Sequence, residues 1–166
     1  MADNRPDMDE RRIAIDMLDA QEGTGPVPLL GGDQPAALLR RAKRIAMVGA
    51  SDNPMRPSHD VLLYLLGEGY DVVPINPNTE EVAGRRAYAT LEQATEETGH
   101  FDMVDVFRRP EHTPDVARSA VATGAGSLWL QLGVVNWEAA RIAHEAGLPV
   151  VMDRCTKIEH RRGRWS

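Results

Sequence analysis

From residue 43 onwards, short apolar runs alternate with longer stretches of mixed polarity. The apolar runs are rich in β-branched residues and cover residues 44–50, 70–76, 101–107, 127–133 and 148–154. The stretches between them have the apolar spacing of helices and cover residues 57–69, 90–99, 112–124 and 136–147. Each of these stretches closes on a glycine that suits a helix C-terminus, namely Gly69, Gly99, Gly124 or Gly147. The pattern predicts five strands separated by four helices.

The connections between the predicted strands are too long for hairpins, which favours parallel pairing. Helices between parallel strands cover both faces of the sheet. We therefore predict an α/β fold with a doubly wound, five-stranded parallel sheet of Rossmann-like type. Ligands of such sheets bind beyond the carboxyl ends of the strands, where the winding direction changes. The residues that directly follow each strand are the ones to search for a site.

The first 42 residues do not share this alternation. Residues 9–21 have helical spacing, a glycine- and proline-rich stretch follows, and residues 33–42 indicate a short helix with Asp33 as its cap. We predict an N-terminal arm at 1–42 with one or two short helices, packed on a domain at 43–166 or reaching a second subunit of a homodimer. A partly ordered tail is the alternative.

Composition and charge narrow the classes of function. The chain has 166 residues, enough for one domain with a sizeable core, and a formal net charge of −6, which argues against general binding of nucleic acid. No apolar run reaches the roughly 18 residues that a membrane span needs. The acidic N-terminus lacks the apolar segment of a secretory signal. A single cysteine, Cys155, excludes an internal disulfide framework and a zinc site built from cysteines. We expect a cytoplasmic protein with neither a membrane partner nor a metal.

The turn after the first predicted strand has the features of an anion site. Gly49 and Ala50 lack bulk, so a ligand can approach the backbone closely, and the free N–H groups of the next helix face the same space. Arg56 adds a charged, planar set of donors that suits phosphate oxygens. Neutral hydrogen bonds can come from Ser51, Asn53 and Ser58. The alternative is that the polar side chains of this turn only cap the helix.

An ordinary nicotinamide-dinucleotide site is disfavoured on two grounds. The turn at residues 49–54 reads GASDNP and lacks the G-x-G-x-x-G fingerprint. The second strand ends in Asn76 and Pro77, where dinucleotide folds usually place an acid for the ribose hydroxyls. Asp71 lies at the start of that strand, on the wrong edge of the sheet.

The remaining strands bring further residues to the same edge. The third strand ends in Arg108 and Arg109, followed by Pro110; because adjacent side chains of an extended segment point in opposite directions, we expect at most one arginine to face a ligand. The fourth and fifth strands add Gln131, Gly133 and Cys155. A rim of arginines, small residues and amides without a pair of acids suits a polyanionic nucleotide.

Four motifs in this order carry a family resemblance: VGASDNPMRPSH, VPINPNTEEVAGRRAY, DVFRRPEHTPDV and DRCTKIEH. Residues from about 43 to 160 resemble the small bacterial and archaeal CoA-binding proteins. More distantly they are similar to the N-terminal CoA-binding domain of the succinyl-CoA synthetase α subunit. The resemblance implies a Rossmann-like domain with coenzyme A as its ligand.

The resemblance also implies a role for each group of residues. The CoA phosphates would lie on the first turn and helix, at Gly49, Ala50, Ser51, Arg56 and Ser58. The adenosine part would be flanked by Asn76, Pro77 and the loop of Pro110, and the pantetheine arm would pass Gln131 and Gly133 towards Cys155.

One position departs from the family pattern. Several relatives carry a lysine directly after the Asn-Pro pair, where this chain has Asn78. A contact to the ribose 3′-phosphate of CoA would then need a substitute cation from Arg56, Arg85 or Arg86.

The sequence favours a binding protein over an enzyme. The related synthetase uses a phosphorylated histidine from a second domain together with a partner subunit, and neither fits inside this chain. His59, at the start of a helix, could hydrogen-bond a phosphate or simply occupy the first turn. We expect binding of CoA or an acyl-CoA without catalysis by this chain. A partner-dependent subunit of an acyl-CoA ligase or transferase and an NAD(P)-binding nucleotide sensor are the alternatives.

Cys155 has two readings. It follows a strand and Arg154, whose charge would favour a thiolate, so it could form a mixed disulfide with the CoA thiol. Alternatively, it is a small apolar residue that only packs.

Overall fold

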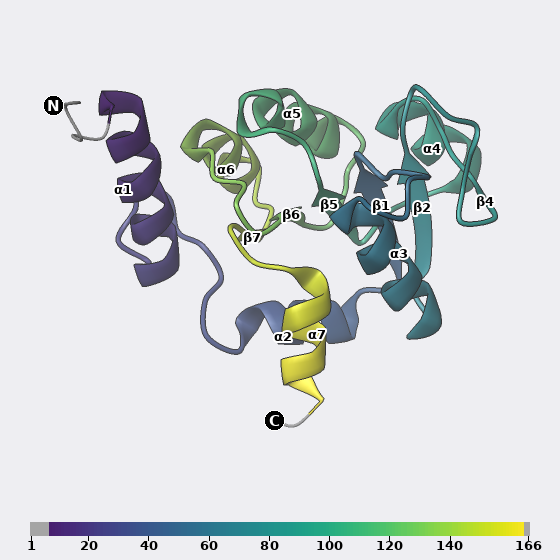
Figure 1. Cartoon of the computed structure of the whole chain (residues 1–166), viewed down its shortest axis with the longest axis horizontal. Coiled ribbons are helices and arrows are strands. Elements are labelled where there is room, and N and C mark those ends of the chain that lie inside the picture. Colours follow the sequence, from purple (N-terminus) through teal and green to yellow (C-terminus); the bar gives the residue numbers. More distant parts are fainter. Residues whose placement is uncertain (1–6, 165–166) are drawn as a thin grey trace, which may run out of the picture.

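The computed structural model describes residues 7–164, with a five-stranded parallel sheet at the centre of the fold (Figure 1). Its strands are β1 (Arg44–Val48), β2 (Asp71–Ile75), β5 (Met103–Val106), β6 (Leu128–Leu130) and β7 (Val150–Val151). They lie in the order β2-β1-β5-β6-β7, and every neighbouring pair is parallel. This is a doubly wound order, so the predicted Rossmann-like fold is confirmed. The winding direction changes between β1 and β5.

Helices cover both faces of the sheet (Figure 1). One face carries α4 (Leu91–Thr98), α5 (Thr113–Ala122) and α6 (Trp137–Glu145). The other face carries α2 (Gln34–Arg41), α3 (Pro57–Gly67) and α7 (Thr156–Gly163). The four helices predicted between the strands are α3, α4, α5 and α6, and each ends one or two residues before the expected glycine.

The two halves of the core differ in side-chain size. In the half under α5 and α6, these two helices contribute small buried side chains, including Ala117, Ala120 and Ala139. The half under α2, α3 and α7 is built from larger side chains such as Leu39 and Trp129. Trp129 is fully buried, and its Nε1 donates to the backbone oxygen of Arg154 at 2.7 Å. This bond ties β6 to the segment that follows β7.

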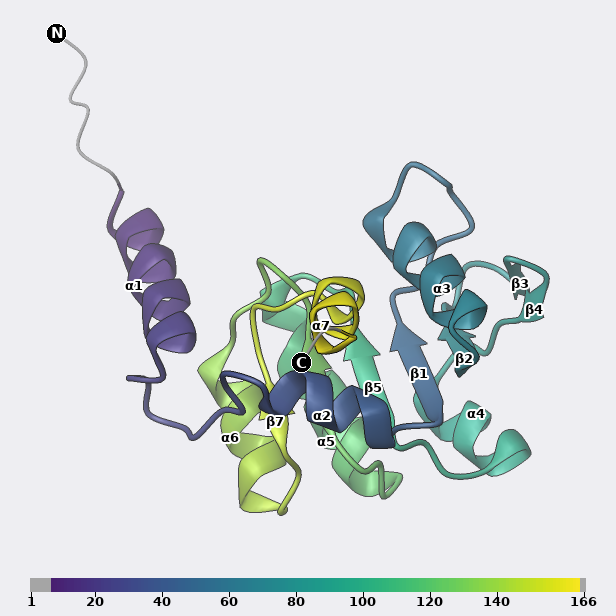
Figure 2. The same ribbon diagram turned by 90° about the horizontal axis from the view of Figure 1, so that it is seen from below.

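The N-terminal arm has two helices that differ in burial. α1 (Met8–Glu22) stands away from the sheet, and Ala20 is its only buried residue among those described (Figure 2). Gln21 anchors the end of α1, because its Nε2 donates to Asp153 Oδ2 at 3.0 Å. In contrast, α2 buries Leu38 and Leu39 in the core. Asp33 lies at the N-cap position of α2, but its side chain makes no capping hydrogen bond.

The division at residue 42 stays a prediction, since α2 packs into the same core as the sheet. Residues 1–6 of the predicted arm and 165–166 of the predicted domain lie outside the described residues. None of the described helices has the length and apolar character that crossing a membrane would require.

Three elements were not predicted. A small antiparallel hairpin joins β3 (Glu81–Val82) to β4 (Arg85–Arg86), and a 3₁₀ helix covers Pro110–His112. The third element is α7, whose sequence TKIEHRRG has too few apolar positions to show helical periodicity. α7 nevertheless packs against the rest of the domain. Its Glu159 is buried and forms an ion pair with Arg154 at 3.4 Å.

Gly49 occupies the point where the chain leaves β1 at the change of winding direction. Its φ is +85°, and a Cβ atom built there would lie 2.4 Å from the backbone oxygen of Phe107, at the end of β5. Only glycine avoids both the left-handed strain and this backbone clash. Gly49 therefore allows the segments after β1 and β5 to run side by side.

We expect Gly49→Ala to lower the free energy of unfolding by at least about 2 kcal/mol, because the strain and the clash add. Chemical denaturation measures this directly. Gly67→Ala is the matched control: Gly67 ends α3, its added Cβ meets nothing within 4 Å, and alanine there should raise stability by about 0.5–1 kcal/mol. Equal stability of the wild type and Gly49→Ala would contradict this account of the turn.

Candidate functional site

A cavity of about 680 Å³ opens at the carboxyl ends of β1, β5 and β6. It lies where the winding direction changes, which is where doubly wound sheets hold their ligands. Eight of the residues predicted from the sequence line it: Gly49, Ser51, Arg56, Ser58, Arg108, Pro110, Gln131 and Cys155. The topology therefore brings residues from four separate segments into one space.

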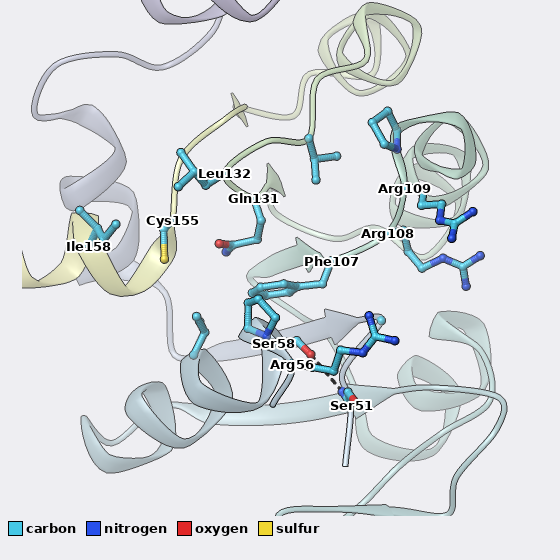
Figure 3. A pocket seen from close by; sticks show the side chains of 15 residues that line it. Ser51, Arg56, Ser58, Phe107, Arg108, Arg109, Gln131, Leu132, Cys155 and Ile158 are labelled. Carbon is cyan, nitrogen blue, oxygen red and sulfur yellow. Dashed lines mark hydrogen bonds between the residues drawn. The ribbon is translucent and has the colours of Figure 1, made fainter. Parts of the chain in front are cut away.

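The cavity has a cationic end and an apolar end. Arg56, Arg108 and Arg109 gather on one side, and Leu132, Cys155 and Ile158 lie on the other (Figure 3). Further apolar lining comes from Val61, Phe107 and Val134. The site therefore suits an elongated ligand with a negative charge at one end and a neutral chain at the other.

The arginines of the cationic end have no ion-pair partner within residues 7–164. Elsewhere in that range arginines pair with acids: Arg44 with Asp71, and Arg118 with Asp115. Cations that lie close together without ion-pair partners repel one another, and an anion bound between them would reduce that repulsion.

Both Arg108 and Arg109 line the cavity, so the alternation of side chains does not separate them, and the expectation that at most one faces a ligand stays a prediction. The alternation rule applies to extended strands, but β5 ends at Val106 and the chain turns into the 3₁₀ helix at Pro110. This turn directs both guanidinium groups to the same side (Figure 3).

The turn after β1 is held by its own polar groups. The backbone N–H of Ser51 donates to Ser58 Oγ at 3.1 Å, and the ring Nδ1 of His59 donates to the backbone oxygen of Ser51 at 2.8 Å. Asn53 is exposed, and its Oδ1 accepts from the backbone N–H of Met55 at 3.0 Å. His59 and Asn53 therefore shape the turn, while Ser58 and Arg56 remain on the cavity wall.

Five predicted residues lie outside this cavity. Ala50 is fully buried beneath the turn, Asn53 is exposed, and Gly133 donates its N–H to Asp153 Oδ1 at 2.7 Å on the rim. Asn76 and Pro77 line a second, wide hollow together with residues of the β3–β4 hairpin.

Asn76 has a clear structural role. Its Nδ2 donates to the backbone oxygen of Ala50 at 2.8 Å, and its Oδ1 accepts from the backbone N–H of Asn78 at 2.8 Å. The first bond joins the segment after β2 to the turn after β1, and the second holds the backbone of the segment after β2 itself.

Two of the three arginines that could substitute for the missing lysine already form ion pairs with acids. Arg85 pairs with Asp71 at the start of β2, on the far edge of the sheet. Arg86 lies 3.3 Å from Glu97 and stacks over the Tyr88 ring. Arg56 is the substitute that both lines the cavity and lacks an ion-pair partner among residues 7–164.

A buried polar cluster lies directly below the cavity. Asp105 on β5 is fully buried, and its Oδ1 accepts from Gln131 Nε2 at 2.5 Å. Thr156 Oγ1 donates to Asp105 Oδ2 at 3.1 Å and accepts from Gln131 Nε2 at 2.9 Å. Burial raises the pKa of the Asp105 carboxyl to about 7, and the hydrogen bonds from Gln131 and Thr156 oppose that rise only in part.

Sequence reasoning missed Asp105 and the apolar end of the cavity. A signal for Asp105 was present, because it is the one polar residue within the apolar run MVDV. Ile158 had no such signal, since α7 was not predicted. Cys155 is half-buried at this apolar end, and both readings of its thiol stay predictions. No group of three His, Cys, Asp or Glu side chains within residues 7–164 could hold a metal ion.

Comparison with known proteins identifies the relatives of this chain. The profile of a family described as "CoA binding domain" matches residues 43–161. An uncharacterized protein of Bacillus subtilis, YneT, is 43% identical over 123 residues, covering 74% of this chain and 89% of YneT. The crystal structure of a version of the PH1109 protein redesigned for binding superimposes with a TM-score of 0.77 at 38% identity, covering 83% of this chain and 96% of that one.

A larger enzyme shares the fold alone. A dinucleotide-forming acetyl-coenzyme A synthetase of Candidatus Korarchaeum cryptofilum superimposes with a TM-score of 0.56 at 23% identity. The match covers 65% of this chain and 25% of the synthetase.

The raised pKa of Asp105 predicts a dependence of stability on pH. Between about pH 4 and pH 7 the folded state keeps the Asp105 proton while the unfolded state loses it, so stability falls as the pH rises. Asp105→Asn removes the titratable group, and the oxygen of its amide can still accept from Gln131 Nε2. The variant should gain up to about 4 kcal/mol over the wild type on going from pH 4 to pH 7.5.

Denaturant unfolding at a series of pH values measures this difference. Asp115→Asn, which removes an exposed carboxylate on α5, is the control for the loss of one negative charge. Identical pH slopes for the wild type and Asp105→Asn would contradict a raised pKa.

Proposed function

We propose that this chain, which belongs to the CoA binding domain family, binds coenzyme A or an acyl-CoA in the cavity between the ends of β1, β5 and β6. The observation that carries the proposal is the division of the cavity into two ends. One has three arginines without an ion-pair partner among residues 7–164, and the other is apolar and reaches Cys155. Coenzyme A has the same division, with a phosphorylated nucleotide at one end and a neutral arm that ends in a thiol.

The phosphates would lie at the turn after β1. Gly49 leaves room for close approach of the backbone, and Ser58 presents its hydroxyl in the first turn of α3. The N-terminus of this 11-residue helix favours negative charge. Arg56 and Arg108 would supply charged hydrogen bonds from either side.

The adenosine part would extend towards the hollow that contains Asn76 and Pro77. Arg56 would then provide the cation for the ribose 3′-phosphate, since Arg85 and Arg86 are engaged with acids. Without a lysine after Pro77, this contact would come from a different segment than in the relatives that have one.

A binding role without chemistry by this chain fits the lining of the cavity. No histidine lines it, and the His59 ring is bound to the Ser51 backbone. Asp105 lies below the wall and is shielded by Gln131. A nicotinamide dinucleotide is a poorer match, because the end of β2 offers the Asn76 amide, which is hydrogen-bonded to the neighbouring backbone, instead of a free carboxylate.

Calorimetry with CoA, dephospho-CoA, NAD and ATP tests the proposal. We expect the wild type to bind CoA most tightly, dephospho-CoA more weakly, and NAD and ATP weakest. Arg56→Ala should weaken CoA by about tenfold or more and abolish the preference for CoA over dephospho-CoA, because a charged hydrogen bond to the 3′-phosphate is lost.

Arg141→Ala is the control for removing one positive charge. Arg141 lies on α6, pairs with Glu145 at 3.7 Å and is absent from the cavity wall. The Arg141→Ala variant should bind CoA with the affinity of the wild type. Tighter binding of NAD than of CoA, or no binding of CoA, would overturn the proposal.

A further inference from the structure

Gln131 is the most deeply buried polar side chain on the wall of the cavity. It directly follows β6, is 3% exposed, and extends its amide towards the side of the cavity that holds Cys155 (Figure 3). Its neighbours at that end include the apolar side chains of Val61, Leu132 and Ile158. A buried amide among apolar groups needs partners for its donors and for its acceptor.

The donors of this amide are already satisfied. Nε2 donates to Asp105 Oδ1 at 2.5 Å and to Thr156 Oγ1 at 2.9 Å. Within residues 7–164, no group donates to Oε1 of Gln131. Because Nε2 is turned to the cluster below, Oε1 is the atom of the amide that is left to face the cavity.

The opposite orientation of the amide is disfavoured. With Asp105 ionised, it would place Oε1 against the carboxylate oxygen Oδ1, so that two acceptors would meet where a donor and an acceptor now do. It would also leave the N–H₂ group without the two acceptors it has. Asp105 and Thr156 therefore determine that the apolar end of the cavity presents a hydrogen-bond acceptor.

We propose that Oε1 of Gln131 accepts a hydrogen bond from the neutral arm of the ligand, and that Asp105 and Thr156 act as positioning residues for this acceptor. The inference rests on the proposed function and adds to it a determinant of specificity. An acceptor among apolar side chains favours a chain with an N–H or S–H donor and disfavours phosphate oxygens. The ligand would therefore bind in one direction, with its phosphates at the arginines and its arm at Gln131.

The arm of CoA carries donors of both kinds, two amide N–H groups and a terminal thiol. Adenosine 3′,5′-bisphosphate carries neither, because it lacks the arm, and desulfo-CoA has the amides without the thiol. These three ligands separate the contribution of the nucleotide, the amides and the thiol.

Calorimetry on variants of the full chain tests the inference. Gln131→Met keeps the length of the side chain and removes the acceptor. We expect it to weaken CoA by about tenfold and to leave the affinity for adenosine 3′,5′-bisphosphate unchanged. If Gln131→Met weakens desulfo-CoA equally, the donor is an amide; if it leaves desulfo-CoA unaffected, the donor is the thiol.

The positioning role is tested at Asp105. Asp105→Asn retains an oxygen that can accept from Gln131 Nε2, so it should keep wild-type affinity for CoA. Asp105→Leu removes that oxygen and should reduce affinity for CoA but not for adenosine 3′,5′-bisphosphate. A general loss of structure would weaken both ligands together, which separates the two explanations.

Ser127→Ala is the matched control for losing a buried hydrogen bond. Ser127 precedes β6 at the opposite edge of the sheet, where its Oγ donates to the backbone oxygen of Asp102 at 2.8 Å. It should bind both ligands as the wild type does.

Wild-type affinity of Gln131→Met for CoA would overturn this inference alone. A wild type that binds adenosine 3′,5′-bisphosphate and CoA equally would also overturn it, because the arm would then make no contribution. A wild type that binds neither would overturn the proposed function and this inference together.

Discussion

The close approach of the segments after β1 and β5 is the constraint on which the site depends. β1 and β5 are paired in the middle of the sheet, but the chain leaves them towards opposite faces. Gly49 makes this possible, because its missing Cβ leaves room for the backbone oxygen of Phe107. The cavity forms above this point, with Ser51 and Arg56 arriving from one side and Arg108 from the other. A bulkier residue at position 49 would push apart the two segments that carry the proposed phosphate contacts.

The two ends of the cavity have different physical requirements and are built by different parts of the fold. The cationic end is formed by the loops after β1 and β5. The arginines of these loops have no ion-pair partner among the described residues. The apolar end needs a rigid wall, which is supplied by α3, α7 and the buried cluster of Asp105, Gln131 and Thr156. A ligand with a charged nucleotide and a neutral arm would satisfy both ends at once. This match of polarity is the physical basis of the proposed function, and membership of the family supports it independently.

Local sequence patterns predicted the sheet and the helices well and the contacts of the site only in part. The strands were predictable because their apolar runs are short and bounded by glycines, and the edge that holds the site followed from the parallel fold. The hydrogen bond between Gln131 and Asp105 joins residues 26 positions apart, which no local pattern encodes. α7 was not predicted because most of its residues are charged or polar, so the few positions that pack against the rest of the domain show no helical spacing of apolar residues. The alternation of side chains did not separate Arg108 from Arg109, because β5 ends at Val106 and the chain enters the 3₁₀ helix at Pro110.

The most direct test of the central claim is a crystal structure of the protein soaked with coenzyme A. The account predicts density in the cavity at the ends of β1, β5 and β6, with phosphate oxygens within hydrogen-bond distance of Arg56 and Arg108. The thiol end of the arm should lie beside Gln131 and Cys155. Density confined to the hollow near Asn76, a ligand bound in the reverse direction, or an empty cavity at saturating concentration would contradict it.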